Sequence, residues 1–207
     1  MRGLIEQETD IHMKSAYTEM LEGSLKHPQA QQWYAVWSIR LKNGEWVGDL
    51  CYKGEPTNGA VEIGYGIVEA HQGNGYATEA ISASIDWAFA QQGVYVVTAE
   101  TEPDNHRSIH VLEKLGFTQK GEGVEGPRFE KEKPPTSWLA IYMMMGMAVG
   151  IAFGAPSGNT GVTLSIGMGV GLALGAAVDH QENAQREKAR AAREATQTTK
   201  VGESPEP

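Results

Sequence analysis

Residues 71–78 read His-Gln-Gly-Asn-Gly-Tyr-Ala-Thr, a pattern that suits the binding of an anion by the protein backbone. Gly73 and Gly75 lack the side chains that would keep a phosphate away from main-chain N–H groups. The loop contains no Lys or Arg, so backbone amides would have to meet most of the ligand's charge. The chemistry that this loop predicts is recognition of a phosphate or diphosphate group.

A strand and a helix must hold this loop in place. Residues 60–68 form an apolar run that predicts a strand before the loop, and Ile81, Ile85 and Ala88 recur at helical spacing after it. The start of such a helix presents free N–H groups and the positive end of the helix dipole. We therefore expect the loop to join the end of a strand to a helix N-terminus.

Three kinds of glycine-rich loop occupy such a position. A P-loop requires Gly-Lys-Ser/Thr, and residues 75–77 lack the lysine. A dinucleotide-binding fingerprint requires a third glycine where Thr78 stands, although Glu100 at the end of the next predicted strand would suit the ribose. The third kind, Gln/Arg-x-x-Gly-x-Gly/Ala, binds the pyrophosphate of acetyl-CoA in N-acetyltransferases, and residues 72–77 match it at every fixed position.

A second motif lies in residues 105–117, which read Asn-His-Arg-Ser, then mostly apolar residues, then Gly-Phe. Asp104 or Asn105 can cap a helix here, and Gly116 can take the left-handed conformation that follows its end. The order and spacing of the two motifs resemble the GNAT superfamily of N-acetyltransferases over about residues 20–133. The sequence is most similar to the branch that acetylates the N-termini of ribosomal proteins.

This resemblance implies an α/β (α+β) fold, and the remaining pattern agrees with it. The periodicity predicts a series of short elements: helices over 10–22, 78–91 and 105–115, and strands over 33–41, 46–52, 94–100, 117–122 and 127–132. An Asn-Gly pair at 43–44 predicts a tight hairpin turn. We therefore expect a GNAT-type mixed sheet, mostly antiparallel and flanked by helices, in a domain of residues 1–135.

The resemblance also implies acetyl-CoA as co-substrate and names the residues that would handle it. The coenzyme would be bound by the strand end, the loop and the second motif: Ile67, Val68, Gln72, Gly73, Asn74, Gly75, Tyr76, Ala77 and Asn105. Glu62 is the candidate base, acting through water, and Ser108 is the candidate group that assists the leaving thiolate. Structural readings compete with these roles: a helix cap for Asn105, a solvated strand residue for Glu62 and a helix serine for Ser108.

The predicted reaction transfers an acetyl group to an amine, on a small molecule or a protein N-terminus, by direct attack in a ternary complex. Cys51 is expected to be buried rather than to carry the acetyl group. The alternative is a catalytically inactive protein that binds CoA or partners and assembles through its C-terminal glycines. Leu112, which stands where many members carry a tyrosine acid, and a short N-terminal segment favour this alternative.

The composition bears on the partners, the metal content and the cellular location of the protein. A net charge of -9 argues against a nucleic-acid partner. The single cysteine excludes a disulfide framework and a thiolate metal cluster, fits a reducing cytosol, and leaves no metal site to predict. Residues 1–6 contain no long apolar run, so no secretory signal is expected.

The sequence changes character after residue 135. Residues 138–155 and 162–178 contain no charged side chain and predict a hydrophobic helical hairpin over 136–180. A polar tail, 181–207, should be helical at first and then disordered. Glycines recur at every fourth position in both apolar runs, a spacing that lets helices approach closely: Gly146, Gly150 and Gly154, and Gly167, Gly171 and Gly175.

Two interpretations of this hairpin stay open. Residues 138–178 could insert in a membrane and tether a cytoplasmic catalytic domain, and basic residues near both ends agree with a cytoplasmic location of those ends: Lys131, Lys133, Arg186, Lys188, Arg190 and Arg193. The hairpin could instead be buried in a soluble protein or in a homo-oligomer.

Overall fold

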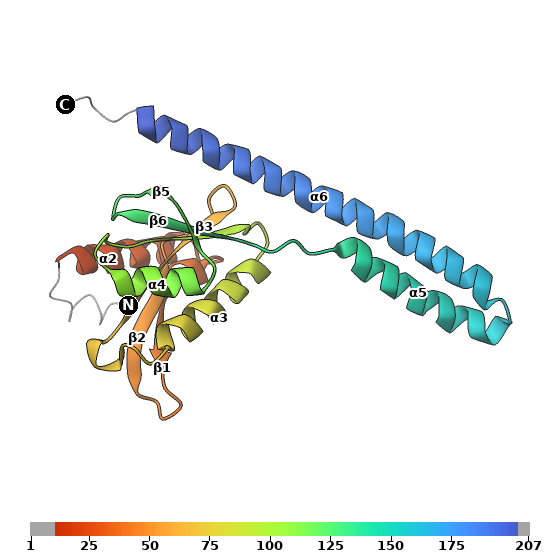
Figure 1. The fold of residues 1–207 in the computed structure, drawn as a ribbon, viewed down its shortest axis with the longest axis horizontal. Helices are drawn as coiled ribbons and strands as arrows, with labels where there is room; N and C mark the ends of the chain where they lie inside the picture. The colour runs from red at the N-terminus through yellow and green to blue at the C-terminus, as the bar shows by residue number, and fades with distance from the viewer. Residues whose placement is uncertain (1–10, 203–207) are drawn as a thin grey trace. The chain divides into compact units, whose positions relative to one another are not determined.

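The computed structural model describes residues 11–202, and the expectations about the start of the chain and its last five residues lie outside this range (Figure 1). The chain divides into two compact units, Met1–Lys133 and Pro134–Pro207, and each is described by itself.

The first unit contains a six-stranded sheet with the order β1-β2-β3-β4-β6-β5. Its elements are α2 (Ile11–Lys26), η1 (Gln31–Trp33), β1 (Val36–Arg40), β2 (Trp46–Tyr52), β3 (Ala60–Ile67), η2 (Glu69–His71), α3 (Tyr76–Ala90), β4 (Val96–Glu100), α4 (His106–Lys114), β5 (Thr118–Glu122) and β6 (Pro127–Glu132). β3 and β4 are parallel, and the other neighbouring strands are antiparallel. The predicted mixed, mostly antiparallel sheet with helices is confirmed.

The predicted strand over 33–41 is too long at its start. Residues 31–33 form a short 3-10 turn, and the ladder with β2 begins only at Val36. The reason is packing: the buried Trp33 ring lies 5.2 Å from the Tyr52 ring and 4.8 Å from the Trp87 ring, between centroids. The Asn-Gly turn that follows β1 is present, with Gly44 at φ 90°.

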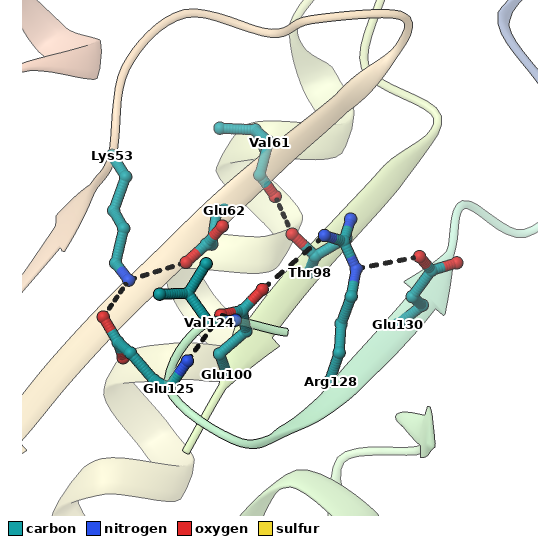
Figure 2. A network of polar contacts seen from close by, with 9 residues as sticks. All are labelled: Lys53, Val61, Glu62, Thr98, Glu100, Val124, Glu125, Arg128 and Glu130. Carbon is teal, nitrogen blue, oxygen red and sulfur yellow. Dashed lines mark hydrogen bonds and ion pairs between the residues drawn. The ribbon is translucent and has the colours of Figure 1, made fainter. Parts of the chain in front are cut away.

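Both α3 and α4 pack on one face of the sheet. Ile81 and Ile85 of α3 and Leu112 of α4 belong to one buried cluster with Val61 of β3 and Val97 of β4. Since Val61 and Val97 are paired neighbours, their side chains lie on the same face of the sheet. The adjacent pair, Glu62 and Thr98, projects from the opposite face, which is polar (Figure 2).

β3 and β4 separate soon after they meet. Their pairing covers only residues 60–62 with 96–98, although β3 continues to Ile67 along β2. β4 instead pairs along its whole length with β6. Beyond Glu62, the edge of β3 that faced β4 therefore has no strand partner among the described residues, and the two strands enclose a wedge.

The start and end of α4 confirm the helix signals in the second motif. The Asn105 side chain accepts a hydrogen bond of 3.1 Å from the Ser108 N–H at the helix start. Gly116 has φ 80°, and N–H groups of Gly116 and Phe117 donate to Glu113 and Leu112 in the pattern of a Schellman motif. This ending fixes the direction in which the chain leaves toward β5.

The second unit consists of two long helices, α5 (Trp138–Ser157) and α6 (Thr160–Gly202), that pack against each other. Gly158, at φ 71°, ends α5. α6 passes Asp179 without a break, so the polar segment after residue 180 continues the second helix of the hairpin as far as Gly202. α5 and the apolar part of α6 are long and apolar enough to cross a membrane, by length and composition alone.

Glycine permits the contact between α5 and α6. A Cβ atom at Gly150 would lie 2.6 Å from the Thr163 carbonyl oxygen, and one at Gly175 would lie 2.5 Å from Leu139 Cα. These distances are too short for any side chain, so the backbones meet directly. Gly169, by contrast, has nothing within 4 Å of the position where a Cβ would stand.

Gly150→Ala should weaken the hairpin, because the added methyl overlaps the backbone of α6. Gly169→Ala is the matched control and should stabilise α6 by about 1 kcal/mol through helix propensity alone. The stabilities of the two variants are compared by chemical unfolding of the full-length chain in mild detergent, with the helical circular dichroism signal as the readout. Equal stability of the two variants would contradict the direct backbone contact.

Candidate active site

The loop after β3 has the open form that anion binding requires. Gly73 and Gly75 have φ of 79° and 83°, in the left-handed region that favours glycine, and no atom lies within 4 Å of either Cβ position. The Asn74 side chain donates to the carbonyl oxygens of His71 at 3.0 Å and Gln72 at 3.2 Å. These bonds fold the loop on itself and leave its glycine backbone accessible.

The N-terminus of α3 completes this cradle. Gly75 is the N-cap residue, and no side chain caps the helix there. The Gly75 carbonyl accepts the first helical bond from Glu79 at 3.1 Å, so the amides of Tyr76, Ala77 and Thr78 precede the hydrogen-bonded turns. These amides and the helix dipole favour anionic oxygen atoms at this place.

A cation lies beside the loop, which the sequence alone did not reveal. Arg107 of α4 donates a hydrogen bond to the Gln72 side-chain oxygen, and the Gln72 amide nitrogen donates to the Ile67 carbonyl at 3.0 Å. The second motif thus contributes a positive charge to the first. The expectation that backbone amides meet most of the ligand's charge is therefore incomplete. Arg107 is 35 residues from Gln72 in the sequence, and only the fold brings its charge to the loop.

Two candidate coenzyme residues already use backbone groups within the chain: Val68 uses its N–H and its carbonyl, and Ile67 uses its carbonyl. The Val68 N–H donates to Val47 at 2.9 Å, and the Val68 carbonyl accepts from His71 at 2.8 Å. The Ile67 carbonyl accepts from Gln72. In this arrangement, only the side chain of Val68 remains for a ligand. The part of β3 without a strand partner on this edge is residues 63–66, which directly follow Glu62.

Ser108 lies next to a tyrosine that the sequence analysis did not select. The Tyr65 hydroxyl, on the unpaired part of β3, is 2.6 Å from Ser108 Oγ on α4. Burial raises the pKa of Tyr65, and the bond to Ser108 partly offsets this effect, so the phenol stays protonated at neutral pH. Asn105, one turn earlier, caps α4 through its side-chain oxygen, which leaves its amide nitrogen available to a ligand.

Glu62 is held in an ion-pair network on the polar face of the sheet (Figure 2). Lys53 Nζ lies 2.7 Å from Glu62 Oε1 and 2.7 Å from Glu125 Oε1. Burial opposes the charge of Lys53, but its bonds to Glu125 and Glu62 outweigh this and raise its pKa to about 12. Glu62 therefore faces a permanently protonated ammonium group and has a second carboxylate nearby.

The turn between β5 and β6 reaches this network by way of Glu100. The Glu100 carboxylate is largely buried and accepts N–H bonds from Val124 at 2.9 Å and Glu125 at 3.3 Å. Gly123 makes this approach possible, since a Cβ there would overlap the Glu100 carboxylate. Arg128 lies 3.6 Å from Glu100 and 3.3 Å from Glu130 (Figure 2). Four carboxylates, those of Glu62, Glu100, Glu125 and Glu130, thus share this polar face with the cations Lys53 and Arg128.

Leu112 and Cys51 have structural rather than chemical roles. Leu112 is fully buried beneath α4, so this helix position points into the core. Burial raises the pKa of the Cys51 thiol, which keeps it protonated and poorly suited to carry an acetyl group. No group of three or more His, Cys, Asp or Glu side chains within residues 11–202 is arranged to hold a metal ion.

Comparison with known proteins identifies the family. The family model described as the acetyltransferase (GNAT) domain matches residues 6–118, more than half of the chain, and the chain belongs to this family. YjdG, an N-acetyltransferase of Bacillus subtilis (strain 168), is 38% identical over 88 residues, which are 42% of this chain and 52% of YjdG. The chain thus spans about half the length of this relative.

Solved structures show similar arrangements. The ribosomal L7/L12 N-acetyltransferase RimL, in complex with coenzyme A, matches with 23% identity and a TM-score of 0.40, covering 43% of this chain and 56% of that one. A chimera of the spermidine N-acetyltransferase SpeG from Vibrio cholerae with hSSAT matches with 17% identity and a TM-score of 0.49, covering 64% and 92%. Acetyl-CoA is the co-substrate of GNAT acetyltransferases.

Arg107→Gln should weaken CoA binding by about five- to tenfold at low salt, because an exposed cation beside the loop is lost. The loss should shrink as salt rises, since exposed charges are screened. Arg40→Gln, at the end of β1, is the control and should bind like wild type. Isothermal calorimetry at two salt concentrations measures both, and an unchanged affinity of Arg107→Gln at low salt would exclude this role.

Proposed function

We propose that this chain transfers an acetyl group from acetyl-CoA to an amine by direct attack in a ternary complex. The observation that carries the proposal is the wedge between β3 and β4, which leads into a glycine loop and an uncapped helix N-terminus. A diphosphate fits the amides of residues 73–77. An extended pantetheine arm, with its own amide groups, fits the unpaired edge of β3.

The residues around the wedge supply the remaining steps. The Asn105 amide nitrogen is placed to bind the pantetheine, and the Ser108 hydroxyl to donate to the sulfur as the C–S bond breaks. Glu62 accepts the amine proton through water as the N–C bond forms, and the thiolate takes its proton from solvent. Alignment of the two reactants supplies much of the rate enhancement.

The polar face beside the wedge favours a cationic acceptor. Glu62 and Glu125 already hold one primary ammonium, that of Lys53, at 2.7 Å each. An amine acceptor, whether a small molecule or a protein N-terminus, arrives as an ammonium of the same kind. It loses one proton to solvent before the reaction, because only the neutral amine has a lone pair for attack, and Glu62 takes the second proton as the N–C bond forms. RimL and SpeG are named for a protein N-terminus and for spermidine, and both kinds of amine belong in a substrate panel.

Glu62→Gln should lower kcat by about 100-fold or more while CoA affinity stays unchanged, because the base is lost and the coenzyme cradle is intact. Glu22→Gln, in an exposed pair with Lys26 on α2, is the matched control. Thiol release from acetyl-CoA with spermidine, kanamycin and an L7/L12 N-terminal peptide measures activity. If wild type binds CoA but turns over no amine, the chain is the non-catalytic CoA-binding protein that the buried Leu112 favours.

A second part of the proposal concerns location: α5 and the apolar part of α6 insert in a membrane and hold a cytoplasmic catalytic domain at its surface. Large apolar side chains exposed on both helices support it: Met144, Met145, Val149, Ile151, Phe153, Val162, Ile166, Met168, Val170, Leu172 and Leu174. Only 11% of each apolar segment is buried within the hairpin. So much exposed apolar surface is unfavourable in water.

The open end of the hairpin suits a membrane surface. The Asp179 carboxylate accepts N–H bonds from Trp138 at 2.9 Å and Leu139 at 3.0 Å, so α6 caps the start of α5. The Trp138 indole donates to Glu182 at 2.6 Å, and Arg186 lies 2.7 Å from Glu182. Polar groups and a tryptophan at one level are typical of the boundary between lipid and water.

Replacing Ile151 and Leu172 together by Arg should move the full-length chain from the membrane fraction to the soluble fraction or to degradation. Each charge within the apolar segment costs about 2.5–3.5 kcal/mol for insertion. The paired substitutions Ile151→Leu and Leu172→Ile keep the surface apolar and should stay with the membrane after a carbonate wash. A wild-type chain that is soluble without detergent would rule the membrane location out.

A further inference from the structure

Tyr65 is a half-buried residue in contact with Ser108 that the proposed chemistry leaves unused. We propose that Tyr65 is a positioning residue for Ser108: its phenol donates to Ser108 Oγ and directs the serine proton toward the sulfur of the coenzyme. This inference rests on the proposed acetyl transfer. It assigns a role to a residue outside the two sequence motifs.

The first observation is where Tyr65 lies. It belongs to the part of β3 beyond Glu62, where β4 has turned away and the wedge opens. Its backbone stays paired with Leu50 of β2, so the strand itself is fixed. Its hydroxyl reaches α4 and contacts Ser108 at 2.6 Å, and both residues are half-buried. The pair therefore links β3 to α4, and the thioester would lie between these two elements.

The next step is the direction of the hydrogen bond, since the geometry allows either oxygen to donate. The Tyr65 hydroxyl also lies 3.5 Å from the Ser108 carbonyl oxygen, a much longer contact than the 2.6 Å to Oγ. A phenol is a far stronger acid than an aliphatic alcohol, and the stronger acid is the better donor. Tyr65 as donor occupies a lone pair of Ser108 Oγ and leaves the serine proton free. Without this partner, a serine in the first turn of a helix tends to donate to a nearby backbone carbonyl. The phenol thus decides where the hydroxyl points.

The chemical consequence is stabilisation of the leaving group without net proton transfer from either residue. As the amine nitrogen forms its bond to the acetyl carbon, the C–S bond breaks and its electron pair moves to sulfur. The Ser108 proton forms a hydrogen bond to the growing thiolate, and the Tyr65 bond polarises the serine hydroxyl further. The acid that other family members place at the Leu112 position is replaced by a two-residue hydrogen-bond chain.

A second tyrosine–serine pair in the same protein provides a control for the structural effect of losing such a bond. Tyr52 on β2 makes a similar pair with Ser84 on α3, where its hydroxyl contacts Ser84 Oγ and donates to the Ser84 carbonyl at 2.7 Å. That pair is fully within the core. Tyr52→Phe therefore removes a tyrosine–serine bond between a strand and a helix that does not involve Ser108, and reports the purely structural cost.

The test compares Tyr65→Phe, Ser108→Ala, the double variant and Tyr52→Phe in the full-length protein. Kinetics use acetyl-CoA and the panel amine with the highest wild-type rate, and calorimetry gives CoA affinity. Ser108→Ala should lower kcat roughly 100-fold and Tyr65→Phe about tenfold, with KM for acetyl-CoA within twofold of wild type. The double variant should match Ser108→Ala, because Tyr65 acts only through the serine.

Other outcomes distinguish a failure of the role of Tyr65 from a failure of the proposed acetyl transfer. Tyr65→Phe with wild-type kcat, or a double variant whose losses multiply, overturns the positioning role and leaves the acetyl transfer intact. A loss of melting temperature and of CoA affinity together, as large as any loss in kcat, assigns Tyr65 the same structural role as Tyr52. A wild-type protein that neither binds CoA nor turns over an amine overturns both the proposed function and this inference.

Discussion

The separation of β3 from β4 is the constraint on which the candidate site depends. Backbone N–H and C=O groups on the free edge of β3 need partners, and a parallel neighbour supplies them for only residues 60–62. β4 pairs with β6 along its whole length, and the β5–β6 turn holds Glu100 at its end, so these contacts fix the course of β4 where it leaves β3. The resulting wedge suits a ligand that carries amides of its own, and the loop at its end suits the ligand's diphosphate.

Charge is distributed unevenly around this wedge, which matters in a chain with a net charge of -9. Arg107 and the N-terminus of α3 provide positive potential at the loop, where an anion would bind. The network of Lys53, Glu62 and Glu125 provides carboxylates on the polar face, where a cationic amine would approach. The two reactants have opposite charge, so this arrangement favours their binding at adjacent places without mutual competition.

Local signals allowed most of the fold to be predicted from the sequence. The caps of α4, the turn at Gly44 and the alternation in β3 depend on neighbouring residues and are present in the structure. Contacts between distant residues could not be predicted. Trp33 leaves the strand pattern because it packs on Trp87, and the Tyr65–Ser108 and Arg107–Gln72 pairs join elements that only the fold brings together. The continuity of α6 through Asp179 could not be predicted either, because the change in composition there suggested a boundary between the hairpin and the polar tail.

Amide hydrogen exchange with and without coenzyme A tests the central claim most directly, because it reports on the backbone groups themselves. The account predicts slower exchange on CoA binding in residues 73–78 and in residues 63–67 of β3, with no change in residues 14–26 of α2. Protection confined to another part of the chain, or none at a CoA concentration that saturates GNAT acetyltransferases, would contradict the proposal that this wedge and loop hold the coenzyme.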